Sequence, residues 1–181
     1  MNLYQTLTRA EAIPGYMTKS ELKWLAETSR SLPAGAHWAE IGSLCGRSLL
    51  AVGLQLPPTS TLVSVDLNWG SELRAGITAH QVFDELARTR KAELELHAIR
   101  GASVSVAEMF ADHWFDVVFI DAAHDYDNVC ADVRAWQRTV KPGGLLCGHD
   151  YSRDWPDVKR VVDELFPQRE VIGSIWMQRI Q

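Results

Sequence analysis

The 181-residue chain has few cysteines, no basic run and no long apolar segment, and each absence excludes a class of protein. Its cysteines, Cys45, Cys130 and Cys147, are odd in number and far apart, which argues against a disulfide framework and a thiolate zinc site. The net charge of −5, without a cluster of lysines and arginines, gives little electrostatic support for binding nucleic acid or an anionic membrane. No apolar run approaches the ~20 residues of a membrane-spanning helix. The first residues lack the basic and apolar blocks of a signal peptide, so we expect a cytoplasmic protein.

What is present is an ordinary globular composition, with 46% hydrophobic and 23% charged residues. Apolar runs alternate with helical stripes, which indicates a parallel α/β sheet in a single domain over residues 1–181, with a helical lead-in over residues 1–33. Residues 1–17 show no clear pattern, 68–76 are expected to form a loop and 141–144 a turn. Helices are predicted over residues 18–32, 46–56, 78–92, 103–111 and 126–140, and from residue 156. Strands are predicted over residues 37–41, 62–66, 94–99, 115–121, 145–148, 170–172 and 175–179.

A glycine loop joins the first predicted strand to the helix that follows it. Gly42 and Gly46 have the spacing Gly-x-x-x-Gly, and glycine permits tight turns and the close approach of a ligand. The N-terminus of the following helix offers unpaired N–H groups to a carboxylate or phosphate. The spacing differs from the Gly-x-Gly-x-x-Gly of dinucleotide sites. Such a loop is also a common structural turn, so the prediction of a ligand site needs a second residue.

Asp66 is that second residue. It ends the strand at 62–66, where an acidic side chain can accept hydrogen bonds from both ribose hydroxyls of a nucleoside. The alternative is a loop or helix-capping carboxylate. Together, the glycine loop and Asp66 predict a nucleoside at the carboxyl edge of the sheet.

Two more strands end in polar residues at the same edge. Asp121 ends one strand and is followed by His124, and His149 and Asp150 follow the next. Two carboxylates and two imidazoles there could bind a divalent cation, with oxygen ligands favouring Mg²⁺, Ca²⁺ or Mn²⁺ and histidines favouring Mn²⁺ or a later transition metal. Without a metal, His124 or His149 would be the general base. Asp125 is expected to be the N-cap of the helix that follows.

Taken in order, these segments resemble the motifs of class I S-adenosylmethionine-dependent methyltransferases. The first, second and fourth motifs of that family are matched by Glu40-Ile41-Gly42-Ser43 with Gly46-Arg47-Ser48, by Val65-Asp66, and by Phe119-Ile120-Asp121. The turn at 142–144 and the terminal hairpin fit the same family. The small-molecule O-methyltransferase branch is matched by Pro14-Gly15-Tyr16, Glu21, Asp121-x-x-His124-x-Tyr126 and His149-Asp150. The resemblance implies a Rossmann-like, doubly wound sheet of seven strands, mostly parallel, with an antiparallel C-terminal hairpin strand.

By this resemblance, the chain transfers a methyl group from S-adenosylmethionine to a small-molecule acceptor, most simply at a hydroxyl. Asp66 would hold the ribose, Leu67 would lie beside the adenine, and Ala102 and Ser103 would lie at the adenine edge. The full set of implied cofactor-binding residues is Glu40, Gly42, Ser43, Gly46, Ser48, Asp66, Leu67, Ala102, Ser103 and Asp121.

The metal-dependent O-methyltransferases hold Mg²⁺ after strands four and five, which implies Asp121, His149 and Asp150 as ligands here. His149 departs from the pattern, because the catechol type carries Asp there, so a metal-dependent and a metal-free reaction both stay open. Trp69, Trp155 and Tyr151 are expected to form an apolar wall for the acceptor. Little chain precedes residue 37, so we expect a pocket that is open or is completed by the second subunit of a homodimer.

Two alternatives belong to other functional classes. One is an NAD(P)-dependent oxidoreductase on a similar sheet, which the glycine spacing and the terminal hairpin disfavour. The other is a cofactor-binding module without turnover, which the acidic and histidine residues after the fourth and fifth strands disfavour.

Overall fold

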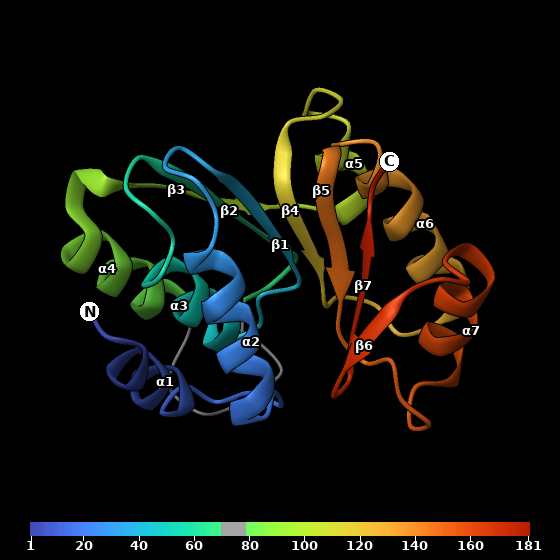
Figure 1. Cartoon of the computed structure of the whole chain (residues 1–181), viewed down its shortest axis with the longest axis horizontal. Helices are drawn as coiled ribbons and strands as arrows, with labels where there is room; N and C mark the ends of the chain where they lie inside the picture. Colours follow the sequence, from blue (N-terminus) through green and yellow to red (C-terminus); the bar gives the residue numbers. More distant parts are fainter. Residues whose placement is uncertain (70–78) are drawn as a thin grey trace.

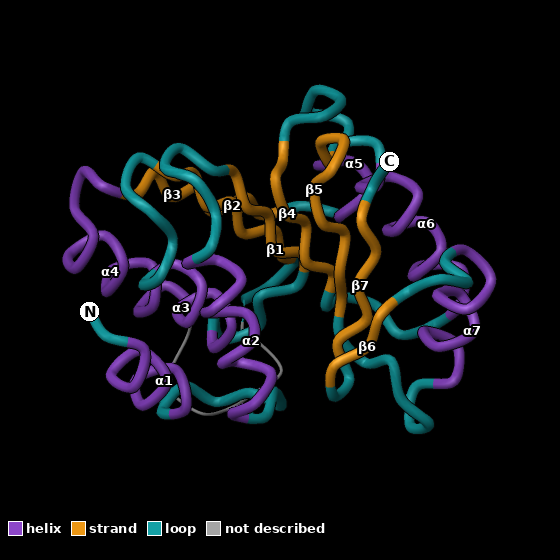
Figure 2. Tube along the Cα trace, viewed as in Figure 1, coloured by secondary structure: helices purple, strands orange, loops and turns teal. Residues whose placement is uncertain are grey.

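Seven strands form one twisted sheet with helices on both faces in the computed structural model of the chain (Figures 1 and 2), which describes residues 1–69 and 79–181. The helices are α1 (Leu3–Glu11), α2 (Lys19–Arg30), α3 (Arg47–Gly53), α4 (Ala79–Arg90), α5 (Ser103–Ala107), α6 (Tyr126–Gln137) and α7 (Pro156–Leu165), with a 3₁₀ turn at Lys91–Glu93. The strands are β1 (His37–Ile41), β2 (Ser60–Asp66), β3 (Leu94–Arg100), β4 (Phe115–Ile120), β5 (Val140–Gly148), β6 (Glu170–Ile172) and β7 (Ile175–Arg179).

The strand order confirms the predicted doubly wound topology. The order is β3-β2-β1-β4-β5-β7-β6, in which β1 to β5 pair in parallel and β7 pairs antiparallel to both β5 and β6. The order reverses between β1 and β4, so the connections after these two strands leave on opposite faces. Such a switch point opens a crevice at the carboxyl ends of the strands, where open α/β sheets bind ligands.

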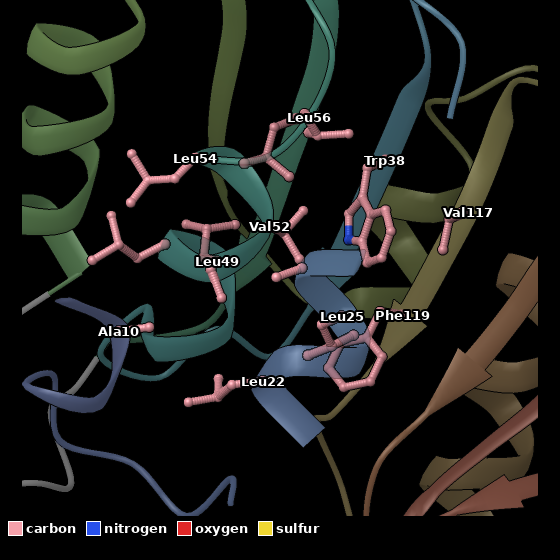
Figure 3. Close-up of a cluster of buried hydrophobic side chains, with 14 of the residues drawn as sticks. Ala10, Leu22, Leu25, Trp38, Leu49, Val52, Leu54, Leu56, Val117 and Phe119 are labelled. Atoms are coloured by element: carbon pink, nitrogen blue, oxygen red, sulfur yellow. The ribbon is translucent and has the colours of Figure 1, made fainter. Parts of the chain in front are cut away.

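The helices divide between the two faces of the sheet and bury one apolar layer on each (Figure 1). Helices α1 to α4 cover one face, where Leu22, Leu25, Trp38, Leu49 and Phe119 belong to the cluster in Figure 3. Helices α5, α6 and α7 cover the other face, over a cluster drawn from alternate residues of the same strands. This double coverage explains why the central strands β1, β2 and β4 are buried along nearly their whole length.

No helix in the described part of the chain has the length and apolarity needed to span a membrane.

The structure corrects several predicted boundaries. The segment 1–17, which shows no clear sequence pattern, contains α1, whose N-cap Asn2 and N3 residue Gln5 form a capping box. Helices α3, α5 and α6 end three or four residues before their predicted ends. The turn predicted at 141–144 lies inside β5, as an irregularity between the pairs Phe115–Val140 and Val117–Leu145, because its backbone also pairs with Ile180 beyond β7. Most of the loop predicted at 68–76 lies outside the described residues.

Candidate active site

A cavity of about 840 Å³ lies at the carboxyl edge of the sheet, at the switch point. This volume suits a nucleoside-sized ligand together with a small acceptor. The cavity is lined by the loops after β1, β2, β3, β4 and β5, by residues 14–17 of the lead-in and by Trp155. The structure therefore brings Asp66, Asp121 and Asp150, which are far apart in the chain, to one common cavity, as predicted.

Gly42 fixes the distance between two of these loops. Its φ is +84°, and a Cβ at this position would lie 2.0 Å from the backbone oxygen of Asp121. The Asp121 N–H donates to Ile41 O at 2.7 Å, and the Gly42 N–H donates to Val65 O at 2.8 Å. Only glycine combines the left-handed backbone with so close an approach, so Gly42 is needed to set the glycine loop against Asp121.

The carboxylate of Asp66 organises the loops on both sides of it. Oδ2 accepts from the backbone N–H groups of Ser43 and Leu44, both at 3.0 Å. Oδ1 accepts from those of Asn68 at 2.7 Å and Trp69 at 2.9 Å. A carboxylate has about four lone-pair sites, and backbone donors already use all of them. The hydroxyl groups of a bound ribose would therefore have to replace some of these backbone donors or share the Asp66 oxygens with them.

Glu40 and Gly46 lie behind the cavity wall, whereas the other predicted cofactor residues line it. Glu40 is fully buried; Ser48 Oγ donates to its Oε1 at 3.0 Å, and its Oε2 has no hydrogen-bond partner among the described residues. Burial raises the pKa of Glu40 to about 8, against the opposing effect of the Ser48 hydroxyl. Gly46, in the left-handed conformation, is the N-cap of α3.

Asp121, His124 and Asp150 form an acidic and histidine cluster, hereafter the polar cluster, at the end of the cavity beside β4 and β5. One ligand-type atom from each lies within 4.8 Å of the others, a spacing that a single metal ion can bridge. His124 Nε2 is 2.8 Å from Asp150 Oδ2, and this hydrogen bond raises the pKa of His124. Burial raises the pKa of Asp121 to about 7, a shift that His149 opposes and Asp150 reinforces. Burial alone would raise the pKa of Asp150, but His124 and His149 hold it below its ordinary value.

His149 also lines the cavity, beside the polar cluster, and has carboxylates on both sides. Its Nδ1 is 3.1 Å from Asp150 Oδ1 and 3.7 Å from Asp121 Oδ1, and its Nε2 is 3.5 Å from Glu21 Oε2. Burial would lower its pKa, but these carboxylates raise it to about 10. A histidine that is charged at neutral pH has no free lone pair for a metal ion or a proton. The charge of His149, and the grouping of His124 rather than His149 with the two aspartates, therefore favour His124 both as a metal ligand and as a base.

Strained backbone gathers at this cavity. Leu44, Trp69 and Asp150, which all line it, have φ of 49°, 32° and 63° without being glycine. Such conformations persist where surrounding contacts enforce them, and they tend to occur at functional sites. At Asp150, the left-handed turn directs one carboxylate oxygen to each histidine of the pair, His124 and His149.

Aromatic side chains form part of the cavity rim. The Trp155 ring stacks on His124 with a centroid separation of 4.0 Å, and Tyr16 lies in the rim with 80% of its surface exposed. Trp69 lines the cavity as predicted. Tyr151 is not part of the wall, because its hydroxyl turns to α7 and donates to Asp163 Oδ1 at 2.7 Å.

The sequence analysis did not predict the roles of two residues at the site, Glu21 and Asp132. Glu21 forms a capping box with Thr18, and its contact with His149 joins segments 128 positions apart. Asp132 of α6 lines the cavity with only 5% of its surface exposed. A signal existed for Asp132, because an acidic residue falls on the same helical face as Val129, Val133 and Trp136.

Comparison with known proteins identifies the family. A family model described as a methyltransferase domain matches residues 39–151, more than half of the chain. An O-methyltransferase from Bacillus cereus, in complex with S-adenosylhomocysteine, has 19% sequence identity and a TM-score of 0.63, over 97% of this chain and 89% of that one. The S-adenosylhomocysteine-bound methyltransferase PaMTH1 of Podospora anserina has 14% identity and a TM-score of 0.70, over 99% of this chain and 87% of that one.

A third structure carries a metal. MycE, a methyltransferase from the mycinamycin biosynthetic pathway in complex with Mg and S-adenosylhomocysteine, has 15% identity and a TM-score of 0.66, over 99% of this chain and 54% of that one. At such identities these likenesses establish the fold, and the family model sets aside the nicotinamide-dependent alternative. The chain thus belongs to the methyltransferase-domain family, as an S-adenosylmethionine-dependent enzyme with the class I fold.

Proposed function

We propose that this enzyme methylates a hydroxyl group of a small molecule, with the help of a divalent cation held by Asp121, His124 and Asp150. The observation that carries the proposal is that the polar cluster shares one cavity with the glycine loop and Asp66. A methyl donor bound along β1 and β2 would present its sulfonium toward this cluster. The acceptor, the metal and the choice of oxygen as nucleophile all belong to this proposal.

The donor set suits a divalent cation. Two carboxylates and an imidazole from two neighbouring strand ends lie close enough to share one ion. The carboxylates favour Mg²⁺ or Mn²⁺, and the imidazole favours Mn²⁺ of the two. When bound, the cation would lower the pKa of a coordinated acceptor hydroxyl and fix its position. Asp121 has a raised pKa because it is buried beside another carboxylate, so a positive charge there would favour its ionised form.

The residues of the chain position the two reactants for direct transfer. The acceptor oxygen attacks the methyl carbon as the carbon–sulfur bond breaks, and the sulfonium becomes a neutral thioether. Because His124 would hold the cation in this reaction, the acceptor proton would pass to solvent at the open side of the cavity, where His124 keeps 35% of its side-chain surface exposed. Because the sulfonium is already reactive, most of the acceleration would come from orientation. Trp155, Trp69 and Tyr16 supply apolar surface for the body of the acceptor.

A metal-free reaction is the second candidate, and one contact favours it. The 2.8 Å hydrogen bond between His124 Nε2 and Asp150 orients an imidazole in the cavity wall, which is the arrangement of a general base and its orienting carboxylate. In that case His124 would accept the acceptor proton in the absence of any cation.

Two measurements test these proposals. Calorimetry should show S-adenosylhomocysteine binding in the low micromolar range or tighter, and failure to bind would contradict the site itself. Transfer of a labelled methyl group to a panel of hydroxylated and amine-bearing metabolites should then identify an oxygen acceptor. Loss of turnover in EDTA and its recovery with Mn²⁺ or Mg²⁺ supports the metal reaction, whereas full turnover in EDTA supports His124 as the base. Turnover with amines alone would contradict O-methylation.

We also expect a cytoplasmic enzyme and a homodimer.

A further inference from the structure

A buried carboxylate lines the cavity away from the polar cluster. Asp132, in the middle of α6, has 5% of its surface exposed. It is one of four aspartates in the cavity lining among the described residues, with Asp66, Asp121 and Asp150. The other three lie at strand ends, in the loops that hold the methyl donor and the polar cluster, whereas Asp132 comes from a helix. Its position therefore needs a separate explanation.

The neighbours of Asp132 place it at the base end of the bound nucleoside. Ser103, at the start of α5, hydrogen bonds with the Asp132 side chain, and α5 follows β3. If Asp66 holds the ribose and the polar cluster faces the methyl group, the base must lie on the side of Leu67 and the β3–α5 loop. Leu67 and Val104, with 61% and 39% of their surfaces exposed, offer apolar surface to the faces of a flat ring. The edge of that ring would then point toward Ser103 and Asp132.

Among the described residues, the side chain of Asp132 has one hydrogen-bond partner, Ser103. The Trp136 Nε1–H donates to Ser103 Oγ at 2.8 Å, which leaves the single Ser103 hydroxyl hydrogen to donate to Asp132. One hydrogen fills one of about four acceptor positions on a carboxylate. Burial raises the pKa of Asp132, against the effect of Ser103, so further hydrogen-bond donors would stabilise its charged form. A ligand that brings N–H donors would satisfy it.

We propose that Asp132 recognises the 6-amino group of the adenine of the methyl donor. That amino group carries the hydrogen-bond donors on the base edge of adenine, and a carboxylate is its natural acceptor. The β3–α5 loop, Arg100-Gly101-Ala102-Ser103, supplies no carboxylate of its own, so the acceptor comes from α6 instead. The neutral acid would also fit, because it accepts from the amino group through one oxygen and donates to ring nitrogen N1 through the other. The inference rests on the proposed binding of S-adenosylmethionine in this cavity.

Calorimetry with two ligands tests the assignment without an acceptor substrate. The probes are S-adenosylhomocysteine and its analogue in which hydrogen replaces the 6-amino group. The wild-type protein should prefer S-adenosylhomocysteine by roughly ten- to a hundredfold, as expected for a hydrogen bond to a charged group. Asp132→Ala should bind the two ligands with affinities within about twofold of each other. Asp127→Ala is the matched control, because this exposed aspartate lies on the same helix outside the cavity, and it should keep the wild-type preference.

Each outcome decides the question. Equal binding of both ligands by the wild type, or a wild-type preference in Asp132→Ala, overturns the assignment. If Asp132→Ala does not fold, Asp132→Asn replaces it, since it has nearly the same shape but a neutral acceptor and a misplaced donor, and it should lose at least threefold of the preference. An unchanged preference in Asp132→Asn then overturns the proposal. A wild-type protein that binds neither ligand contradicts the proposed function as well, which separates that failure from failure at Asp132 alone.

Discussion

Glu21 Oε2 lies 3.5 Å from His149 Nε2, and both side chains are almost fully buried. The same carboxylate accepts from the Thr18 N–H and the Ser174 N–H, each at 2.8 Å. One side chain thus joins the lead-in helix, the tip of the C-terminal hairpin and His149 in the cavity wall. Burial would raise the pKa of Glu21, but His149 and these backbone donors lower it to about 2, so Glu21 is charged throughout the physiological range.

Glu21→Gln is expected to destabilise the protein by about 1–3 kcal/mol, because His149 loses one of its counter-charges in a buried setting. Urea denaturation followed by circular dichroism measures this change. Glu27→Gln serves as the control, since Glu27 lies on the same helix but is exposed and contacts only Lys23 among the described salt bridges. If the two variants are equally stable, the buried contact contributes nothing to stability.

The β1–β4 junction gives a prediction that depends on shape alone. Gly42→Ala is expected to cost at least about 3 kcal/mol or to prevent folding, because its Cβ would overlap the Asp121 carbonyl. Gly143→Ala is the control, because it has a similar φ of +79° but no atom within 4 Å of the added Cβ. It should lose only the ~1 kcal/mol of backbone strain. Similar thermal stabilities for the two variants would show that the backbone at Gly42 and Asp121 can move apart at little cost in stability.

The sequence predicted much of the fold because local rules and packing agree there. Short-range patterns predict the strand at 115–121, the helix at 18–32, the N-cap at Asp125 and the hairpin strands at 170–172 and 175–179. The structure contains each of them, with shifts of one or two residues at the ends. The irregular start of β5 could not be predicted, because it depends on pairing with Ile180, far along the chain.

The sequence predicts which strand ends carry the site residues, but it does not predict how their side chains are oriented. The parallel topology places Asp121, His124, His149 and Asp150 at one edge whatever their rotamers. Both histidines line the cavity, but the surroundings of His149 depend on Glu21, a residue of another segment that contacts its Nε2. The position of Asp132 in the cavity wall could not be predicted for a similar reason, because it depends on how α6 packs beside α5.

A pH-dependent prediction concerns Glu40. Its pKa is about 8 in the folded protein and 4.5 as the ordinary value, so between these values the unfolded chain ionises while the buried carboxyl does not. The ionisation of Glu40 therefore does not affect the free energy of unfolding below pH 4.5. Above that value it lowers the stability of the fold increasingly as the pH rises toward 8. Glu40→Gln should gain stability relative to wild type over this range, by roughly 1–3 kcal/mol more at pH 8 than at pH 5. Urea titrations at both values measure this gain, and a constant difference between the two proteins would contradict the burial argument.

Asp66→Ala should abolish measurable binding of S-adenosylhomocysteine, or weaken it at least tenfold. Removal of the carboxylate takes away the proposed ribose acceptor and also frees four backbone N–H groups in two cavity loops. Calorimetry measures the affinity, and thermal unfolding reports whether the loops also lose stability. An unchanged affinity would reject the ribose assignment, and the role of Asp66 would then be only to hold the two cavity loops through its hydrogen bonds.

Asp150→Asn tests the polar cluster with little disturbance of the backbone. Asparagine tolerates the left-handed conformation that Asp150 adopts at φ of 63°, so the variant should fold, while the change removes one of the two carboxylates proposed to hold the cation. Binding of Mn²⁺, measured by electron paramagnetic resonance, should weaken at least tenfold, whereas the affinity for S-adenosylhomocysteine should change less than threefold, because Asp150 faces the histidines rather than the nucleoside loops. Asp154→Asn, at an exposed position in the same loop, should leave both affinities unchanged. Equal Mn²⁺ affinity in the wild type and Asp150→Asn would remove Asp150 from the metal site and leave its contact with His124 as its main function.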